Sequence, residues 1–306
     1  MLSAFPASTK RSYCPITAIV PAFERLEALL KTISIIQCCE PAPEEILVHV
    51  DGGNPEILEV LRWQHPEIQL LVSDHLIGPG GARNRLIAAA KHELVANFDD
   101  DSFPEQPDYF ARVLRLFQEF PGAAMYSAAS QDFEKEMPGP HAIAVSSGCG
   151  CVFRKSWHAL TRGFVPLPIA YGMEETDISL QLHALGGLIV HDPQLHVKHD
   201  KPLPVDVTAR VNATVIANMA LLPYLRYPVL LWPMGLWQVL RRVLYVLSFG
   251  WSQGVWTGLQ MIPSHLAAHR AEIARVTYAA LVSWFFLRLR PRPLKDATIP
   301  AQTACH

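Results

Sequence analysis

Three consecutive carboxylates, Asp99, Asp100 and Asp101, directly follow the apolar run at 94–98. If that run is a strand, alternate side chains share a face, so Asp99 and Asp101 are predicted to point one way and Asp100 the other. Two carboxylates on one face suit Mg²⁺ or Mn²⁺, because such ions prefer oxygen ligands and keep room for water or phosphate. Without a cation the like charges repel one another, and one pKa must rise. The alternative explanation is a solvated acidic turn before a helix.

A second acidic cluster consists of Glu174, Glu175 and Asp177, at the predicted start of a helix within 171–187. Carboxylates in a first helical turn interact favourably with the helix dipole, which is a sufficient structural reason for them. The functional explanation is a general base, a carboxylate that takes the proton from an attacking hydroxyl. The residues alone leave both explanations open.

Two further segments carry weaker signals. Glycines open a predicted helix at 78–93 that carries Arg83 and Arg85, and such a helix start offers backbone N–H groups to an anion. Its spacing matches neither the dinucleotide-binding glycine motif nor a Walker loop, so a plain loop is the default interpretation. The segment 191–200 contains three histidines, and a structural role is the default for each of them.

The elements that must position these residues are indicated by four short apolar runs. Each run is followed by a polar turn and a helix-like segment, which is the rhythm of βαβ units. Unbroken runs of this length predict strands of a parallel sheet buried on both faces. Asp51, Asp74 and the acidic triplet fall at the carboxyl ends of these strands, where an open α/β sheet binds its ligands. The runs are ITAIV at 16–20, ILVHV at 46–50, IQLLV at 68–72 and LVANF at 94–98.

Length and composition set further bounds. The 306 residues suffice for one large domain with an appendage or for two domains. Charged residues make up 18% of the chain, and 26 basic against 28 acidic side chains give a formal charge of −2, which excludes the basic footprint of a nucleic-acid-binding protein. The six cysteines lack zinc-finger spacing, and a chain of this size needs no disulfides, so we expect them to be reduced. Because no signal-peptide-like stretch opens the sequence, we expect a cytoplasmic location.

From about residue 205 the sequence becomes apolar and rich in Trp. No uninterrupted apolar run reaches the roughly 18–20 residues needed to cross a bilayer, since Pro228, Pro233 and the Arg241–Arg242 pair break the longest candidate. One interpretation is a set of helices packed on the preceding domain. A second is helices lying in a membrane interface, with Trp and Tyr at headgroup depth, and a third is a true span.

The same change in amino-acid composition predicts the domain boundaries. The final segment is polar and rich in Pro, which favours disorder. We therefore expect a catalytic domain over 1–204, a helical region over 205–288 and a disordered tail over 289–306.

Several segments, taken in order, resemble glycosyltransferase family 2. "ITAIVPAFERLEALLKTISII" is similar to the opening strand of that family with its Pro-aromatic turn, and "ILVHVDGGN" to its second strand. "GPGGARNRLIAAAKHELVANFDDDS" resembles the helix that runs into the D-x-D strand, "SSGCGCVFRKSW" the glycine-rich strand, and "EETDISLQLHALGG" the acidic helix. The resemblance implies a GT-A fold: an α/β protein with an open, mostly parallel, Rossmann-like sheet flanked by helices. Here a C-terminal helical extension, a candidate for membrane association, would follow that sheet.

The resemblance also implies roles for individual residues. Glu175 falls at the catalytic base, where the family more often has Asp, and Glu174 and Asp177 would contact the acceptor or orient the helix. Asp51 would hold uracil or thymine. The implied nucleotide-sugar-binding residues are Pro21, Ala22, Phe23, Asp51, Arg83, Asp99, Asp100 and Gly148.

A metal site follows from the same resemblance. Asp99 and Asp101 match the D-x-D pair, and His199 matches a position that can complete the metal shell. These three residues would hold Mg²⁺ or Mn²⁺.

The resemblance implies a metal-dependent, inverting glycosyltransferase. It would move a sugar from a UDP- or dTDP-sugar to a hydroxyl of a glycan or lipid-linked acceptor, in glycan, glycolipid or cell-envelope polysaccharide assembly. No Gln-x-x-Arg-Trp motif follows the acidic helix, which argues for a non-processive enzyme. The expected place is the cytoplasm, with peripheral attachment to the inner face of the cell membrane as one option.

Two other classes of function stay open. A nucleotidyltransferase also uses metal-binding carboxylates on an α/β sheet, but "PAFERLE" stands after the first strand where such an enzyme carries a phosphate loop with Gly and Arg or Lys. A non-catalytic, membrane-bound protein that binds nucleotide is the other alternative.

Overall fold

The structure is a computed structural model that describes residues 11–129, 137–167, 173–200 and 209–294. Its strands are β1 (Tyr13–Ala22), β2 (Ala42–Val50), β3 (Gln69–Val72), β4 (Leu94–Asn97), β5 (Ser102–Pro104), β6 (Ala123–Ala129), β7 (His141–Ala142), β8 (Cys151–Arg154), β9 (Leu188–His199) and β10 (Arg292–Pro293). Its α-helices are α1 (Leu26–Gln37), α2 (Pro55–Gln64), α3 (Gly78–Ala89), α4 (Tyr109–Glu119), α5 (Lys155–Ala159), α6 (Glu174–Ala184), α7 (Ala209–Arg226), α8 (Trp232–Ser248), α9 (Val255–Ala268) and α10 (Tyr278–Leu289).

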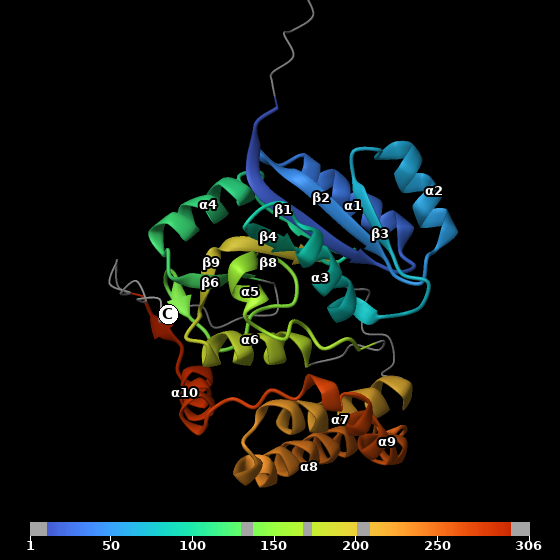
Figure 1. Ribbon diagram of the computed structural model, residues 1–306, viewed down its shortest axis with the longest axis vertical. Helices are drawn as coiled ribbons and strands as arrows, with labels where there is room; N and C mark the ends of the chain where they lie inside the picture. Colours follow the sequence, from blue (N-terminus) through green and yellow to red (C-terminus); the bar gives the residue numbers. More distant parts are fainter. Residues whose placement is uncertain (1–10, 130–136, 168–172, 201–208, 295–306) are drawn as a thin grey trace, which may run out of the picture.

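The predicted α/β sheet is present and fills the upper part of the view in Figure 1. Neighbouring strands follow the order β10-β7-β9-β6-β8-β4-β1-β2-β3, and β5 pairs with β9. The strands β3, β2, β1 and β4 run parallel, as do β6 and β9, whereas the other pairs are antiparallel. Most paired residues lie in the parallel ladders, so the expectation of a mostly parallel sheet flanked by helices is confirmed.

The predicted strand runs at 16–20, 46–50 and 94–98 fall within β1, β2 and at β4, where they are buried. The run at 68–72 also contains a strand, β3, but Val72 is exposed and its neighbours in the strand are partly or fully exposed. The prediction of burial on both faces was therefore wrong for β3. This strand lies at the end of the sheet, where the helices cover it only in part.

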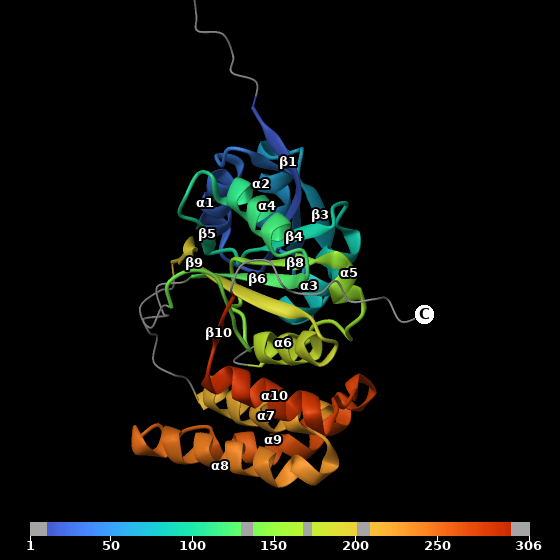
Figure 2. The same ribbon diagram turned by 90° about the vertical axis from the view of Figure 1, so that its left-hand side faces the viewer.

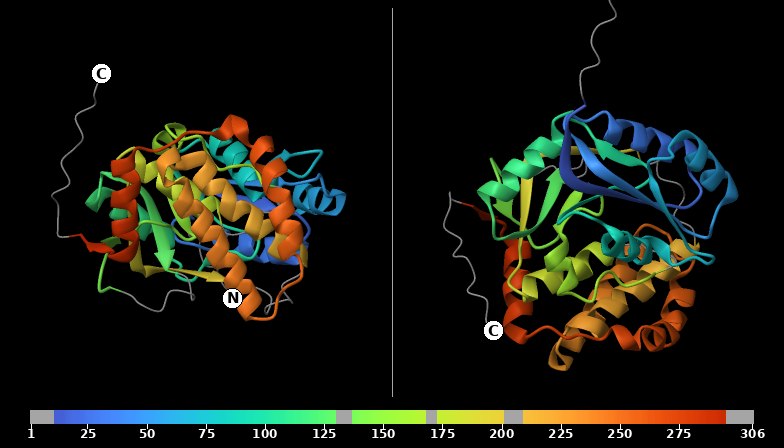
Figure 3. Two further views of the ribbon diagram at one scale, coloured as in Figure 1. Left: turned by 90° about the horizontal axis from the view of Figure 1, so that it is seen from below. Right: turned by 45° about the horizontal axis from the view of Figure 1, so that its top comes forward.

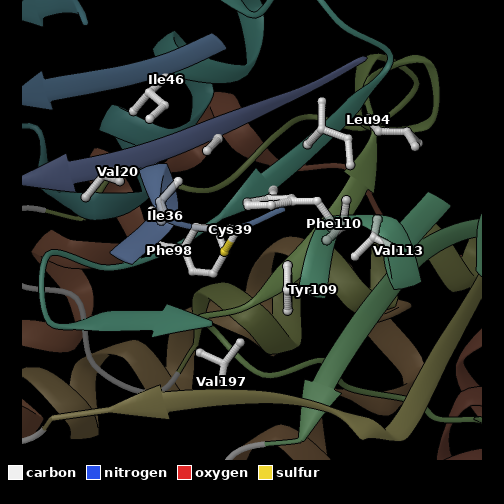
Figure 4. Close-up of a cluster of buried hydrophobic side chains, with 14 of the residues drawn as sticks. Val20, Ile36, Cys39, Ile46, Leu94, Phe98, Tyr109, Phe110, Val113 and Val197 are labelled. Atoms are coloured by element: carbon white, nitrogen blue, oxygen red, sulfur yellow. The ribbon is translucent and has the colours of Figure 1, made fainter. Parts of the chain in front are cut away.

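The largest hydrophobic cluster lies between the sheet and the helices α1 and α4. Figure 4 labels members of this cluster from five parts of the fold: Val20 of β1, Ile36 of α1, Phe98 after β4, Phe110 of α4 and Val197 of β9. Burying such a side chain contributes roughly 1.5–3 kcal/mol. Because apolar residues recur on one face of α4, this helix is held against the sheet through Tyr109, Phe110, Val113, Leu116 and Phe117.

The C-terminal helices form two further layers below the sheet. Figure 2 shows α6 directly under the sheet, α7 and α10 next, and α8 and α9 outermost. Helix α7 packs against both α8 and α9, which the view from below in Figure 3 also shows. The close approach depends on glycine: a Cβ on Gly235 of α8 would overlap Pro223 of α7, and one on Gly258 of α9 would lie 2.7 Å from the carbonyl oxygen of Ala213.

Two expectations concern the end of the chain. None of the helices in the described part of the chain is long and apolar enough to cross a bilayer. Within the predicted disordered tail, α10 ends at Leu289 and β10 pairs with β7. These residues therefore belong to regular elements, although a two-residue strand leaves no periodic pattern in the sequence. Residues 295–306, and the boundary expected at 204, lie outside the described residues.

A buried ion pair joins the acidic helix α6 to the C-terminal layers. Both carboxylate oxygens of Asp177 accept from the guanidinium of Arg226, with Nε at 2.5 Å from Oδ1 and Nη2 at 2.9 Å from Oδ2. Gln181 donates a further bond of 2.8 Å to Oδ2, and both charged side chains are fully buried. The last residue of α7 thereby fixes the first turn of α6.

We predict that Asp177→Asn lowers the free energy of unfolding by about 3–5 kcal/mol, because removing one partner leaves the Arg226 charge buried and unpaired. Urea denaturation followed by tryptophan fluorescence measures the loss. The matched control is Arg115→Gln, which breaks the exposed Arg115–Asp108 pair and is expected to cost less than about 1 kcal/mol. Equal, small losses in both variants would contradict a fixing role for the buried pair.

Candidate functional site

A cleft of about 830 Å³ opens where β1 and β2 end, beside the turn after β4 and the start of α6. Parallel strands end at one edge of a sheet, so Asp51 and the acidic turn come together as the sequence predicted. A second cavity of about 470 Å³ is lined by residues such as Leu160, Arg162 and Thr277 and by no carboxylate of the described residues. The acid chemistry therefore belongs to the larger cleft. Its lining residues are Pro21, Ala22, Phe23, Glu24, Arg25, Asp51, Leu76, Gly78, Pro79, Ala82, Arg83, Asp99, Asp100, Glu174, Glu175, His199, Arg210 and Val211.

The acidic triplet is a turn and not a continuation of β4. The strand ends at Asn97, and residues 99–101 lead into β5. The N–H of Asp99 donates to Ser102 Oγ at 2.7 Å, which fixes the turn locally. The prediction that Asp99 and Asp101 share a face opposite Asp100 was therefore wrong, because side-chain alternation ends with the strand.

Arg25 pairs with the two buried carboxylates of this turn. Its guanidinium forms ion pairs with both Asp100 and Asp101. Burial nevertheless raises the pKa of Asp100 to about 6, although Arg25 opposes the rise. The Arg25 side chain is 49% exposed, so it can change its position without creating a cavity in the protein interior.

His199 lies against the other oxygen of Asp101. The distance between His199 Nε2 and Asp101 Oδ1 is 3.0 Å. Asp101, and secondly Cys149, raise the pKa of His199 to about 10. Burial would raise the pKa of Asp101, but His199 and Arg25 hold it below its usual value.

The Asp101–His199 pair fits a hard divalent cation. In an octahedral Mg²⁺ site with bonds of about 2.0–2.1 Å, neighbouring ligand atoms lie roughly 2.9 Å apart. The observed 3.0 Å matches that spacing, and Asp101 Oδ1 is a buried oxygen that lies against the imidazole. A cation there would take the place of the proton on Nε2.

Arg83 holds the two acidic segments together. Its Nη2 donates to Asp99 Oδ1 at 2.6 Å, and its Nε donates to Asn97 Oδ1 at 3.2 Å. The Nη1 atom lies 4.0 Å from Glu175 Oε1. Burial acts to lower the pKa of Arg83, but Asp99, then Glu175 and Glu174, raise it above its usual value. The guanidinium is therefore a permanent positive charge between the acidic turn and the start of α6.

The two glutamates at the start of α6 differ in burial. Glu174 is almost fully buried, and its Oε1 accepts no hydrogen bond from the described residues. Burial, and secondly the neighbouring Glu175, raise the pKa of Glu174 to about 7. The Glu175 side chain remains 27% exposed in the cleft. A Cβ on Gly148 would overlap Glu175 Oε1, so glycine at this position lets the carboxylate lie against the backbone.

Asp51 serves its own chain as well as facing the cleft. Its Oδ1 accepts from Ser73 Oγ at 2.7 Å and from the N–H of Ile77 at 3.0 Å. Its Oδ2 accepts from the N–H of Gly78 at 2.8 Å and keeps further capacity to accept. The carboxylate therefore caps the start of α3 beside the segment 21–23.

The cleft brings together most of the residues that the sequence singled out, but not all. Asp177 binds Arg226 instead, and Asp74 is exposed outside the cleft. Arg85 donates to the carbonyl of Val72 and does not line the cleft. Predicted residues that line it are Pro21, Ala22, Phe23, Asp51, Arg83, Asp99, Asp100, Glu174, Glu175 and His199, while Gly148 and Asp101 lie directly behind them.

Sequence reasoning missed three residues at the site. Arg25 neutralises part of the acidic turn, Arg210 at the start of α7 lines the cleft, and Cys149 lies 3.6 Å from His199. Arg25 stands next to the Pro-aromatic turn, so its place near a strand end was a usable signal. Nothing in the spacing links Arg210 or Cys149 to the acidic residues.

Comparisons with known proteins agree with this arrangement. Residues 14–199 match the model of the family described as glycosyltransferase like family 2. Among curated proteins, none matches the sequence.

Solved structures share the fold at low sequence identity. A mannosyltransferase from Pyrobaculum calidifontis in complex with GDP-Man and Mn²⁺ superimposes with a TM-score of 0.54 at 15% identity, over 92% of this chain and 81% of that one. GalNAc-T7 with UDP, GalNAc and Mn²⁺ gives a TM-score of 0.54 at 12% identity, over 67% of this chain and 47% of that one. TarS from S. aureus gives 0.50 at 12% identity, over 67% and 40%. This chain thus spans about half or less of the last two proteins.

Proposed function

The chain belongs to glycosyltransferase family 2 and has the GT-A fold, and from that premise we propose that it is a metal-dependent, inverting, non-processive glycosyltransferase. The donor would be a UDP- or dTDP-sugar, and the acceptor a hydroxyl of a glycan or a lipid-linked glycan. One sugar per encounter is proposed because the motif of processive synthases does not follow α6.

The observation that carries the proposal is the charge of the cleft. Six carboxylates line it, against three arginines and His199, whose raised pKa keeps it charged: Glu24, Asp51, Asp99, Asp100, Glu174 and Glu175 against Arg25, Arg83, Arg210 and His199. A diphosphate is itself an anion, so such a cleft would repel it. A divalent cation resolves the conflict, because it binds carboxylate and phosphate oxygens together.

We assign that cation to the pair of Asp101 and His199, with Asp99 close by. Oxygen ligands favour Mg²⁺ or Mn²⁺. When bound, the ion would neutralise the charge that builds on the leaving diphosphate. Arg25 would leave the carboxylates of Asp100 and Asp101 and bind phosphate oxygens instead, since its side chain is half exposed at the cleft.

Asp51 supports a pyrimidine donor. After the three hydrogen bonds from its own chain, its carboxylate can accept one more on the cleft side. The single N3–H of uracil or thymine would supply that bond. The fold alone does not favour one base, because its structural neighbours hold UDP in one case and GDP-Man in another.

Glu175 is proposed as the general base. It would take the proton from the acceptor hydroxyl, which attacks the anomeric carbon on the face opposite the diphosphate and inverts it. The Glu175 side chain next to Gly148 is 27% exposed and can meet an acceptor, whereas Glu174 is buried. Asp177 would act only by orienting α6 through Arg226.

The outermost helices are proposed to lie on a membrane surface. One face of α8 exposes Leu236, Trp237, Leu240 and Leu244, while Arg241 beside them suits anionic headgroups. Helix α8 lies on the far side of α7 from the sheet (Figure 2). Attachment to the inner face of the cell membrane would bring a lipid-linked acceptor to the protein without a span.

Glu175→Gln is predicted to leave UDP affinity in the presence of Mn²⁺ nearly unchanged and to lower turnover by about 100-fold or more, because the amide cannot accept the proton. The measurement is release of nucleoside diphosphate from UDP- and dTDP-sugars, with water as the interim acceptor. A parallel reaction supplies UTP or dTTP with a sugar 1-phosphate. Release of pyrophosphate there would indicate a nucleotidyltransferase, and no release in either reaction would indicate a binding protein.

A double-mutant cycle supplies the control for Glu175. Gly148→Ala should slow wild-type turnover, because the added methyl displaces the Glu175 carboxylate. In a Glu175→Ala background the same change should add little, since no carboxylate remains to be displaced. Full additivity of the two losses would show that Gly148 acts by another route. Wild-type turnover in Glu175→Gln would remove Glu175 from the chemistry.

The membrane proposal predicts that the protein cosediments with anionic vesicles and that Trp237→Ala combined with Leu240→Ala weakens this binding by about tenfold or more, since each side chain contributes roughly 1.5–3 kcal/mol on burial. Trp63→Ala is the control, because Trp63 is 81% exposed on α2, away from this face. Equal binding by both variants, or no binding by the wild type, would contradict the interfacial location.

A further inference from the structure

The imidazole of His199 faces two different sets of ligand atoms. Its Nε2 lies 3.0 Å from Asp101 Oδ1, on the side that we assign to the hard cation. Its Nδ1 lies 3.6 Å from the Sγ atom of Cys149. Asp99, Cys149 and His199 each offer one atom that could bind a metal, and these three atoms all lie within 4.8 Å of one another. They come from three separate parts of the chain: the acidic turn, the loop before β8 and the end of β9.

We propose that Cys149, His199 and Asp99 form a second, overlapping site that binds Zn²⁺ or a similar thiophilic ion. The distance between Cys149 Sγ and His199 Nδ1 supports it. With bonds of about 2.3 Å to sulfur and 2.0–2.1 Å to nitrogen, a tetrahedral zinc ion places these two ligand atoms roughly 3.6 Å apart. The observed 3.6 Å therefore matches the spacing that two ligands of one zinc ion require.

The chemistry of the donors separates this site from the one described above. A thiolate and an imidazole nitrogen select Zn²⁺ over Mg²⁺ or Mn²⁺, which prefer oxygen. The Asp99 carboxylate supplies the third ligand, although Arg83 binds its Oδ1. Three protein ligands leave a fourth position open, as zinc sites that exchange ligands do.

The two sites exclude each other through a shared imidazole. With zinc on Nδ1, the Nε2–H donates to Asp101, an arrangement in which a carboxylate orients the histidine ligand of a zinc ion. Nε2 is then occupied by a proton and cannot bind the hard cation. Zinc is therefore expected to inhibit the transferase, and only this consequence rests on the proposed function.

Cobalt spectroscopy tests the site directly, because Co²⁺ bound to a thiolate gives a near-ultraviolet charge-transfer band. The reference protein carries Cys38→Ser and Cys305→Ser, which removes an exposed cysteine and the cysteine of the C-terminal segment. We expect the band to saturate at one Co²⁺ per chain, to be displaced by Zn²⁺ and to disappear in Cys149→Ser. Cys151→Ser is the matched control, since Cys151 is buried two residues away, and it should keep the band.

Affinities give a second readout. Loss of a residue that only supports a metal ligand typically lowers metal affinity by about 10–100-fold. Because Cys149 would bind the ion directly, we expect Cys149→Ser to lower the Zn²⁺ affinity, measured by dye competition, by more than this. The Mn²⁺ affinity should change little, because thiolates contribute little to hard ions. Absence of the band, or its loss in Cys151→Ser alone, would overturn the site and leave a simple thiol–imidazole hydrogen bond.

The outcome is separable from that of the proposed function. A protein that shows the Cys149-dependent band but transfers no sugar supports the zinc site and refutes the transferase. A protein that binds UDP with Mn²⁺ but gives no band refutes the zinc site alone.

Discussion

A single buried guanidinium, that of Arg83, allows the acidic residues of the cleft to coexist. Asp99 lies on one side of it and Glu174 and Glu175 on the other, and all three raise its pKa against the effect of burial. Without this charge the acidic turn and the start of α6 would repel each other in a poorly solvated cleft. The sheet brings the acidic turn and the start of α6 together, and the positive charge of Arg83 offsets the repulsion between their carboxylates. Where the arginines do not suffice, as at Asp100 and Glu174, the carboxyl pKa rises.

The same constraint explains why the cleft suits a ligand that arrives with a cation. The fixed positive charges leave the site with an excess of carboxylates, and Oδ1 of Asp101 is a buried oxygen at the edge of the cleft. His199 lies at that oxygen: its Nε2 faces Asp101, and its Nδ1 faces the Sγ atom of Cys149. On this account the identity of the metal depends on which nitrogen carries the proton.

The sequence predicts the parts of this site that follow from strand order. Asp51, the acidic triplet and Glu175 could be assigned to one place because parallel strands end at one edge and because their motifs resemble a known family. The orientation of Asp99 to Asp101 could not be predicted, since it depends on where β4 ends and on the hydrogen bond from Ser102. The pairs Asp177–Arg226 and Cys149–His199 join residues about 50 positions apart, and no periodicity encodes such contacts. The partial exposure of β3 depends on its place at the end of the sheet, which its own residues do not reveal.

The central claim is that a divalent cation held by Asp101 and His199 makes the acidic cleft able to bind a nucleoside diphosphate. Calorimetric titration with UDP, and in parallel with dTDP, in the presence of Mn²⁺ or of a chelator tests it most directly. The account predicts binding with Mn²⁺ only, abolished by Asp101→Ala while the thermal stability of the fold is retained. Equal affinity with and without the metal, or undiminished binding by the Asp101→Ala variant, would contradict it.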